Sequence, residues 1–498
     1  MKGEDLPRSC VQGRGKGEGE RTEKMKKIVI VGSGISGLTC AYKIKKKSKE
    51  INLPVEITLI EKEKRLGGVF LTEKINGFLI EGGPDCFESE KPHTLALAEE
   101  LGISERVVGG NEESHITFIF WNKRLWELPK GLLSLAPTRI SSLLFCPFLT
   151  WRGKLRAGFD LFIPPWEEER EDISLAEFYK RRFGKEIFDR VAEPLFGSIY
   201  ACVPENISLK SCWPRGLQLE KEYGSLIRGM LARRKMRKRV STPGQKRLPV
   251  FLTFKDGMSE LTDTLVKNLA GVAFLTGKKV VNLRFGSGEK KYTLILDDGT
   301  DITADICILA TAPSYATAEM VKNMDTGLSD MLMRISYASS ATISLAYKRE
   351  GFPHPLRGFG VLVSRQEKKQ VKAISWSSTK FVNRAPEGYV LIRSFVGNAE
   401  DDTMVYQSDE EILRVVKEDL RQIMGINVEP VLTKIYRWPN SMVQYILGHE
   451  KKVKFIEERV KQYPGLHLIG NAYRGIGISD CIYNASQTAE QVINFLLA

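Results

Sequence analysis

Residues 28–38 read IVIVGSGISGL, an apolar run followed by a glycine-rich segment. The run from Ile28 to Val31 is β-branched and apolar, as expected for a strand buried inside a parallel sheet. Gly32, Gly34 and Gly37 follow with the spacing GxGxxG, and an apolar helical segment begins at Leu38. In such units the glycines permit a tight turn and let the backbone approach a pyrophosphate at the helix N-terminus. The stretch therefore predicts a dinucleotide-binding turn.

A second strand supplies the acidic residue that this turn requires. The segment from Val55 to Ile60 ends on Glu61, 24 positions after Gly37. A carboxylate at this place can accept hydrogen bonds from a ribose diol and repels a 2′-phosphate. NADP is therefore disfavoured, whereas NAD and FAD both remain compatible with the pattern.

The glycines that follow Glu61 favour a flavin over a nicotinamide. EKEKRLGG ends on Gly67 and Gly68, and FLIEGGPDCF (78–87) contains a second glycine-rich turn. A nicotinamide dehydrogenase would continue directly into its next strand and helix, whereas this chain reads as wrapping an extended ligand. The alternative is that residues 82–84 form an ordinary turn in a mixed sheet.

The far end of the chain repeats the strand–glycine–helix pattern. A strand is expected at 466–469, glycines follow at 470, 475 and 477, and a helix is expected from about 482 to 497. A hairpin and a further strand are expected within 292–313. Backbone donors at a helix start attract negative charge, so both ends of the chain are predicted to serve one ligand. This layout is typical of FAD enzymes.

Size and composition limit the classes of protein. A chain of 498 residues, 42% hydrophobic and 27% charged, is long enough for two or more packed domains. Its net charge of +13 favours an anionic partner, and much of the excess lies in 228–247, which we interpret as a solvated surface loop. No nucleic-acid-binding signature is present, so nucleic acid is not expected as a partner.

Cysteine and histidine spacing excludes several chemistries. The eight cysteines and five histidines are dispersed, with no CxxC pair, HExxH or nucleophile elbow. Reduced thiols in a cytoplasmic protein, no metal site and no hydrolytic triad are therefore expected.

Two further segments bear on location. Residues 1–24 are rich in glycine and charge, so we expect a disordered extension, with Met25 as an alternative start. No apolar run reaches the length of a membrane-spanning helix. Residues 128–166 are apolar with interspersed basic residues, which fits either reversible contact with a membrane surface or helical packing over the active site.

Four longer stretches resemble the oxygen-dependent porphyrinogen oxidases, flavoproteins of the amine oxidase superfamily. They read GFLIEGGPDCF (77–87), EPLFGSIYA (193–201), RWPNSMVQYILGH (437–449) and GNAYRGIGISDCI (470–482), and the resemblance extends from about residue 26 to the C-terminus. It implies that FAD removes six electrons from a porphyrinogen in three cycles, with oxygen reduced to hydrogen peroxide.

The resemblance also implies which residues contact FAD. Val280 would lie on the adenine side, Trp438 near the flavin, and Gly475 to Ile478 at the isoalloxazine end. The complete implied set is Gly32, Ser33, Gly34, Ile35, Ser36, Gly37, Glu61, Lys62, Gly67, Gly68, Gly83, Pro84, Asp85, Cys86, Val280, Trp438, Gly475, Ile476, Gly477 and Ile478. Val69, Val443 and Ser479 depart from the family's usual residues, which bears on substrate preference more than on the cofactor.

The implied substrate is coproporphyrinogen III, oxidised to coproporphyrin III in haem b biosynthesis. The resemblance is greatest to the soluble bacterial branch, and the basic net charge suits four propionates better than the two of protoporphyrinogen IX, which ranks second. An amine oxidase, a carotenoid desaturase and a non-catalytic flavin protein are more distant alternatives. No catalytic side chain is assigned. Other haem-pathway enzymes are candidate partners, and the expected location is the cytoplasm, with membrane contact at its inner face as an alternative.

The expected fold class is α/β, with three parts. A discontinuous Rossmann-like FAD-binding domain comprises 25–87, 250–320 and 446–498, and a helical, membrane-facing subdomain comprises 88–205. A mixed α+β substrate domain comprises 206–249 and 321–445, including the basic loop.

Overall fold

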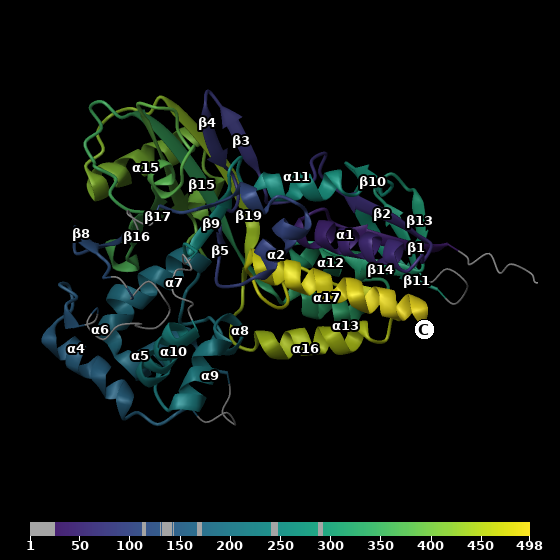
Figure 1. Ribbon diagram of the computed structural model, residues 1–498, viewed down its shortest axis with the longest axis horizontal. Helices are drawn as coiled ribbons and strands as arrows, with labels where there is room; N and C mark the ends of the chain where they lie inside the picture. The colour runs from purple at the N-terminus through teal and green to yellow at the C-terminus, as the bar shows by residue number, and fades with distance from the viewer. Residues whose placement is uncertain are drawn as a thin grey trace, which may run out of the picture.

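The computed structural model describes residues 25–111, 116–129, 131, 142, 144–166, 172–240, 248–286 and 292–498. The extension expected at 1–24 therefore lies outside the described residues. Figure 1 shows three regions: a parallel sheet with its helices on the right, a mixed and mostly antiparallel sheet at upper left, and a group of helices at lower left.

A five-stranded parallel sheet forms the first region. Its strand order is β10-β2-β1-β14-β20, with bounds β1 (Lys26–Val31), β2 (Val55–Glu61), β10 (Ala273–Thr276), β14 (Ile306–Leu309) and β20 (Leu466–Leu468). Ile28 and Ile30 point into one hydrophobic core, whereas Val29 and Val31 point into another. A strand covered on both faces needs an apolar residue at every position, which explains the run IVIV.

Helices cover one face of this sheet, and helices with a small second sheet cover the other. The first core contains α1 (Ile35–Glu50), α2 (His93–Glu100), α11 (Ser259–Lys267) and α17 (Ile478–Leu497). The second contains β11 (Val280–Phe285), β12 (Tyr292–Leu296), β13 (Asp301–Ala304), α12 (Ser314–Val321), α13 (Thr326–Met333) and α16 (His449–Val460). The purple α1 and the yellow α17 pack side by side (Figure 1). The predicted discontinuous Rossmann-like α/β fold is confirmed.

A seven-stranded sheet forms the second region. Its order is β19-β15-β18-β17-β16-β7-β8, with bounds β7 (Thr117–Trp121), β8 (Arg124–Glu127), β15 (Ser336–Lys348), β16 (Gly360–Val363), β17 (Val371–Ser375), β18 (Tyr389–Val396) and β19 (Leu432–Gln444). The amphipathic helix α15 (Asp409–Met424) packs its apolar side on this sheet. Two short sheets link this region to the first: β3 (Thr72–Ile75) with β4 (Phe78–Glu81), and β5 (Phe87–Glu88) with β9 (Phe251–Phe254) and β6 (Val107–Gly109).

Helices around one hydrophobic core form the third region. They are α4 (Trp151–Gly158), α5 (Leu175–Phe183), α6 (Lys185–Ile187), a π-helical turn (Phe188–Ala192), α7 (Glu193–Tyr200), α8 (Leu209–Cys212), α9 (Pro214–Tyr223) and α10 (Leu226–Val240). At its centre the fully buried Arg182 donates to Glu220 and Asp160, which satisfies all three charges. The basic run expected to be a loop is helical as far as Val240, and residues 241–247 lie outside the described part.

The packing differs from the expected domain boundaries in three places. Helix α2 and helix α13 pack into the cores of the parallel sheet, so the FAD-binding region extends beyond residues 87 and 320. Strands β7 and β8 belong to the seven-stranded sheet. Residues 207–227 pack in the helical core and not with the substrate sheet, because their apolar side chains face α5 and α7. Such boundaries depend on contacts between distant segments, which local patterns do not reveal.

Candidate functional site

The turn after β1 contains two positions, Gly32 and Gly37, at which the backbone leaves no room for a side chain. Gly32 has φ +103°, and a Cβ there would lie 2.6 Å from the carbonyl oxygen of Ala310. A Cβ on Gly37 would lie 2.0 Å from the carbonyl oxygen of Gly32. Both positions therefore exclude side chains by contact with backbone, whatever ligand is present.

Gly34 is different, because the space beside it contains no protein atom. A Cβ at Gly34 would have no neighbour within 4 Å. Gly34 is also the N-cap of the 16-residue helix α1, which has neither a capping side chain nor an acidic residue in its first turn. The start of a long helix with no capping side chain offers N–H donors and a positive dipole end to an anion. This geometry fits the pyrophosphate of a dinucleotide.

Glu61 lies beside this turn and is only 8% exposed. One carboxylate oxygen accepts hydrogen bonds from the backbone N–H of Ser33 at 2.8 Å and its hydroxyl at 2.7 Å, and the other accepts from the backbone N–H of Glu63 at 3.0 Å. A carboxylate has about four acceptor positions, so it can also accept from a ribose hydroxyl. The side chain of Lys62, by contrast, is 61% exposed and extends to solvent.

Three glycine turns from separate parts of the sequence meet around Gly34. The backbone N–H of Gly67 donates to the carbonyl of Ser33 at 3.0 Å, and a Cβ on Gly68 would lie 3.0 Å from the Cα of Gly34. A Cβ on Gly83 would lie 1.7 Å from the carbonyl oxygen of Val69. The structure therefore brings the predicted residues of 32–37, 67–68 and 83–86 into one cradle.

A buried ion pair supports the third turn. The ammonium of Lys380 donates to Asp85 at 3.0 Å and contacts the Cys86 sulfur at 3.3 Å. Burial opposes ionisation of Asp85, but the cations of Lys380 and Arg393 outweigh it and hold the pKa of Asp85 below its usual value. Burial, aided by Asp85, raises the pKa of the Cys86 thiol to about 12, so this side chain stays neutral.

Arg393 and Trp438 hold the same turn through its carbonyl groups. The guanidinium of Arg393 donates to the carbonyls of Gly82 and Gly83, and the indole N–H of Trp438 donates to that of Gly82 at 2.9 Å. Trp438 was predicted from the sequence, whereas Lys380 and Arg393 were missed. No local motif marks these two cations, because their partners lie about 300 positions earlier in the chain.

The remaining predicted residues lie at the two ends of the cradle. Val280 is fully buried, and its segment is joined to β2 because the backbone N–H of Lys278 donates to the carbonyl of Glu61 at 3.0 Å. At the other end, Gly477 is the N-cap of α17, and Asp480 caps it by accepting from the backbone N–H of Gly477.

A large cavity adjoins the cradle at the turns 84–86 and 475–478. Its volume is about 1060 Å³, and its lining includes Pro84, Cys86 and the turn from Gly475 to Ile478. Opposite them lie residues of the helical region, among them Tyr200 and Cys212. This volume is at the upper end of the usual range for small-molecule sites, about 300–1,000 Å³.

Two stacked rings lie at the cavity wall, and both belong to the stretch 437–449 that carries the resemblance, although the sequence assigned neither a role. The rings of Tyr445 and His449 lie 4.0 Å apart at 16°, and the Tyr445 hydroxyl donates to the carbonyl of Asn471 at 2.7 Å. Burial lowers the pKa of His449 to about 4, so its imidazole is neutral at pH 7. These two neutral, tightly packed rings therefore give this part of the wall a fixed shape.

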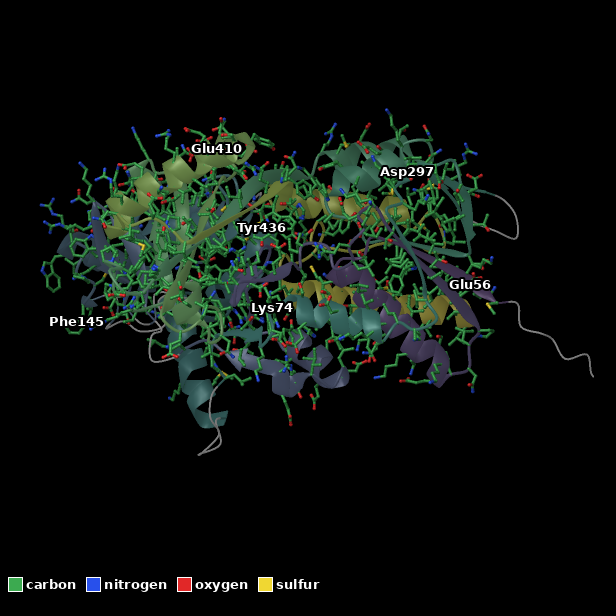
Figure 2. The ribbon with its side chains drawn as sticks, turned by 90° about the horizontal axis from the view of Figure 1, so that it is seen from above. Glu56, Lys74, Phe145, Asp297, Glu410 and Tyr436 are labelled. Carbon is green, nitrogen blue, oxygen red and sulfur yellow. The ribbon has the colours of Figure 1, made fainter. Side chains whose placement is uncertain are left out.

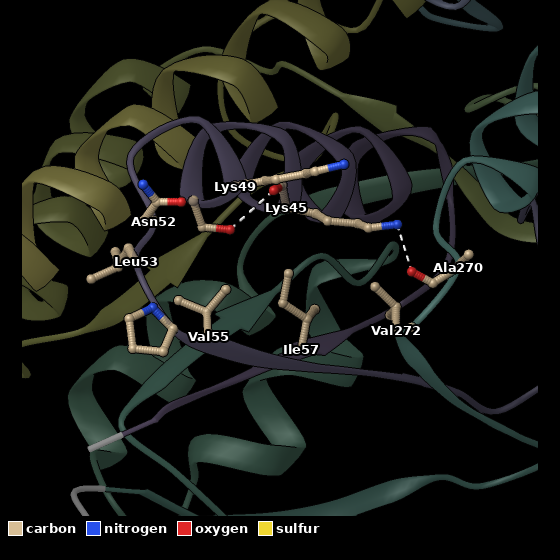
Figure 3. Close-up of a pocket in the computed structure, with 11 residues that line it drawn as sticks. Lys45, Lys49, Asn52, Leu53, Val55, Ile57, Ala270 and Val272 are labelled. Atoms are coloured by element: carbon tan, nitrogen blue, oxygen red, sulfur yellow. Dashed lines mark hydrogen bonds between the residues drawn. The ribbon is translucent and has the colours of Figure 1, made fainter. Parts of the chain in front are cut away.

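Figure 3 shows a second pocket, which is not a candidate site. It is lined by Lys45 and Lys49 near the end of α1, by Val55 and Ile57 of β2, and by the loop at 270–272. The Lys45 ammonium donates to the carbonyl of Ala270 across it. This pocket lies at the amino end of β2, whereas ligands of parallel sheets bind at the carboxyl ends of the strands.

The fold and the cradle together define an FAD-dependent oxidoreductase. Residues 35–493 match the family model described as flavin containing amine oxidoreductase. The chain belongs to this family. The cofactor, the enzyme class and the resemblance noted in the sequence are thereby confirmed.

Among curated proteins, the chain is similar to the coproporphyrinogen III oxidases of Bacillus subtilis and Staphylococcus aureus. It is 34% identical to the first, covering 95% of this chain and 99% of the relative, and 31% identical to the second, covering 94% and 99%. The chloroplast protoporphyrinogen oxidase 1 of Arabidopsis thaliana is 28% identical, covering 94% of this chain and 88% of the relative.

Solved structures agree with this placement. A crystal structure from Exiguobacterium, described as a protoporphyrinogen oxidase, has a TM-score of 0.80 at 28% identity, covering 94% of this chain and 98% of that one. Putrescine oxidase has a TM-score of 0.64 at 14% identity, covering 94% and 99%, which shows the shared fold alone.

Proposed function

We propose that the protein oxidises coproporphyrinogen III to coproporphyrin III in haem biosynthesis, with dioxygen as the electron acceptor and hydrogen peroxide as its product. The observation that carries this proposal is the cavity that joins the turns at 84–86 and 475–478 to the helical region. Relatives named coproporphyrinogen III oxidases match almost their full length to this chain, which supports the substrate class.

The chain's own residues bind, orient and shield the substrate. When bound, FAD would supply the redox chemistry, as the acceptor for a hydride from a carbon that bridges two pyrroles. The cation left behind is delocalised over the pyrroles and can release its N–H proton to water, so no dedicated acid or base is required of the protein. Tyr445 and His449, which are nearly fully buried and stack on each other, give one part of the cavity wall a fixed shape, and Pro84, Cys86 and Ile476 line the same cavity at the cofactor end. Holding the reacting carbon at fixed distance from the cofactor is the protein's main contribution.

Anaerobic mixing with reduced substrate tests the proposed function. The yellow holoenzyme is expected to lose its flavin absorbance within seconds when coproporphyrinogen III is added, and to regain it when air is admitted. Protoporphyrinogen IX is expected to bleach the flavin more slowly. Flavin that neither porphyrinogen reduces would reject the assignment, and faster bleaching by protoporphyrinogen IX would reverse the substrate order.

We also propose that the protein works in the cytoplasm in reversible contact with an anionic membrane surface, where it would meet other haem-pathway enzymes. Trp151, Leu155, Phe159 and Phe162 lie on one side of α4 and its continuation, and Phe145 nearby is 81% exposed. Figure 2 places Phe145 at the outer edge of the molecule, far from Glu56. Exposed aromatic residues of this kind are typical of interfacial helices.

Charge around this apolar surface suits anionic lipid. The one acidic residue in 142–166 is Asp160, which is fully buried, whereas Arg152 is exposed and the Lys154 ammonium lies 4.9 Å from the Trp151 ring centre. Within the described ranges no helix is long and apolar enough to cross a bilayer. These features support surface contact as the mode of association.

Vesicle flotation tests the membrane contact. The wild-type protein is expected to float with vesicles that contain phosphatidylglycerol, and the double variant Trp151→Ser/Phe162→Ser to partition roughly tenfold less, because two aromatic side chains no longer enter the interface. Met333→Ser, at another exposed apolar position (57%), is the matched control and should float normally. Equal flotation of wild type and double variant, or none by the wild type, would contradict this proposal.

A further inference from the structure

The charged lining of the large cavity is uneven. Five basic residues face it: Lys91, Lys210, Lys221, Lys454 and Arg474. Three of these have carboxylate partners, since Lys91 pairs with Asp480, Lys454 with Glu450 and Arg474 with Glu457. Across the part of the chain that the structure describes, no carboxylate pairs with Lys210. Lys210 therefore brings to the cavity a positive charge that forms no ion pair with a described carboxylate, although Glu88 also lines this cavity.

The backbone that carries Lys210 is held on both sides. Lys210 lies in the short helix α8, where the backbone N–H of Leu209 donates to the carbonyl of Ile173 at 3.0 Å. The backbone N–H of Ser208 donates to the carbonyl of Tyr445 at 2.8 Å. The hydroxyl of Ser208 accepts a hydrogen bond from the backbone N–H of Ser211 at 3.1 Å. The backbone of Lys210 is thus held close to the backbone of Tyr445, which lines the same cavity.

A cation that is carried on a held backbone and has no ion-pair partner among the described residues fits an anionic group of the ligand. In a cavity partly shielded from water, an ammonium–carboxylate hydrogen bond is stronger than one at the open surface. A cation that already has a partner gains less from a second carboxylate. We infer that Lys210 binds a propionate of the porphyrinogen and positions the macrocycle in the cavity. This inference rests on the proposed function, which it deepens by naming one residue that recognises the substrate.

Titration of the oxidised holoenzyme with coproporphyrin III, followed by porphyrin fluorescence, measures this contact without turnover. Lys210→Gln is expected to weaken binding about tenfold, as expected for the loss of one charge-assisted hydrogen bond. Lys210→Glu should weaken it further, and Lys210→Arg should keep most of the affinity. In steady-state assays the KM of Lys210→Gln should rise while kcat changes little, because the reacting carbon still reaches the flavin.

Controls separate this inference from the proposed function. Lys185→Gln, in the same helical region but 77% exposed, should bind as the wild type does. All variants should retain the wild-type flavin spectrum, which shows that the cradle is intact. Wild-type affinity in both Lys210→Gln and Lys210→Glu would overturn the inference and leave the function standing. A wild-type protein that neither binds coproporphyrin III nor is bleached by coproporphyrinogen III would overturn the function, and the inference with it.

Discussion

Gly34→Glu is expected to give a folded protein that is purified without its yellow cofactor. The structure leaves room for the new side chain, because no protein atom lies within 4 Å of the Cβ position. The carboxylate would occupy the space at the start of α1 where the pyrophosphate binds, and it would satisfy the N–H donors itself. We expect flavin content below about one tenth of the wild-type value, because a bulky anion replaces the ligand there. Absorbance at the flavin band per mole of protein measures it.

A second glycine provides the matched control for this prediction. A Cβ at Gly286 also meets no protein atom within 4 Å, and this residue lies at the exposed end of β11. Gly286→Glu should therefore keep normal flavin content and thermal stability. Normal flavin content in Gly34→Glu would show that the anion-binding cradle is misplaced.

Lys380→Met is expected to destabilise the protein by about 3–5 kcal/mol and to reduce its flavin content, because it leaves Asp85 charged and almost buried with its nearest cation removed. The pKa of Asp85 lies below its usual value in the fold. The stabilisation from its ionised form is therefore fully present above the ordinary aspartate pKa, about 3.9, and is lost as the pH falls through the lower, folded-state pKa. Urea unfolding at pH 7 measures the loss of stability.

The double variant Lys380→Met/Asp85→Asn distinguishes loss of charge pairing from loss of packing. Removing the carboxylate together with Lys380 should recover most of the lost stability, since Asp85 is no longer left as a charge without its nearest cation, and Arg393 keeps its hydrogen bonds to the carbonyls of Gly82 and Gly83. Lys74→Met, which breaks an exposed pair with Asp256 of similar length (2.8 Å), should cost less than about 1 kcal/mol. A Lys380→Met protein as stable as Lys74→Met would contradict the importance of the buried pair.

Local sequence predicted the parts of the site that local backbone geometry determines. The turns at 32–37 and 475–478 were predicted because a strand, a glycine turn and a helix start are contiguous in the chain, and the structure has all of them. Glu61 was predicted from its distance to Gly37. The hydrogen bonds that hold it to Ser33 were not, because they appear only once β1 and β2 pair.

The residues that escaped prediction act across long separations. Lys380, Arg393 and Lys210 have no motif around them, and each acquires its neighbours through contacts between regions. The basic run at 228–247 was interpreted as a loop because of its charge, yet lysine and arginine are good helix formers, and α10 extends to Val240. The boundaries of the three regions differ from the predicted ones because of contacts between distant segments. Helices α2 and α13 pack against a sheet whose strands are distant from them in sequence.

The order of the parallel sheet has a consequence for synthesis on the ribosome. Strand β1 emerges first, but its neighbour β14 begins at Ile306, and β20 and α17, which complete the sheet and cover α1, come after residue 465. At about 5–20 residues per second, the apolar IVIV segment waits for tens of seconds before its last partners exist. The cavity that the turn at 475–478 lines is therefore complete only after that turn has been synthesised.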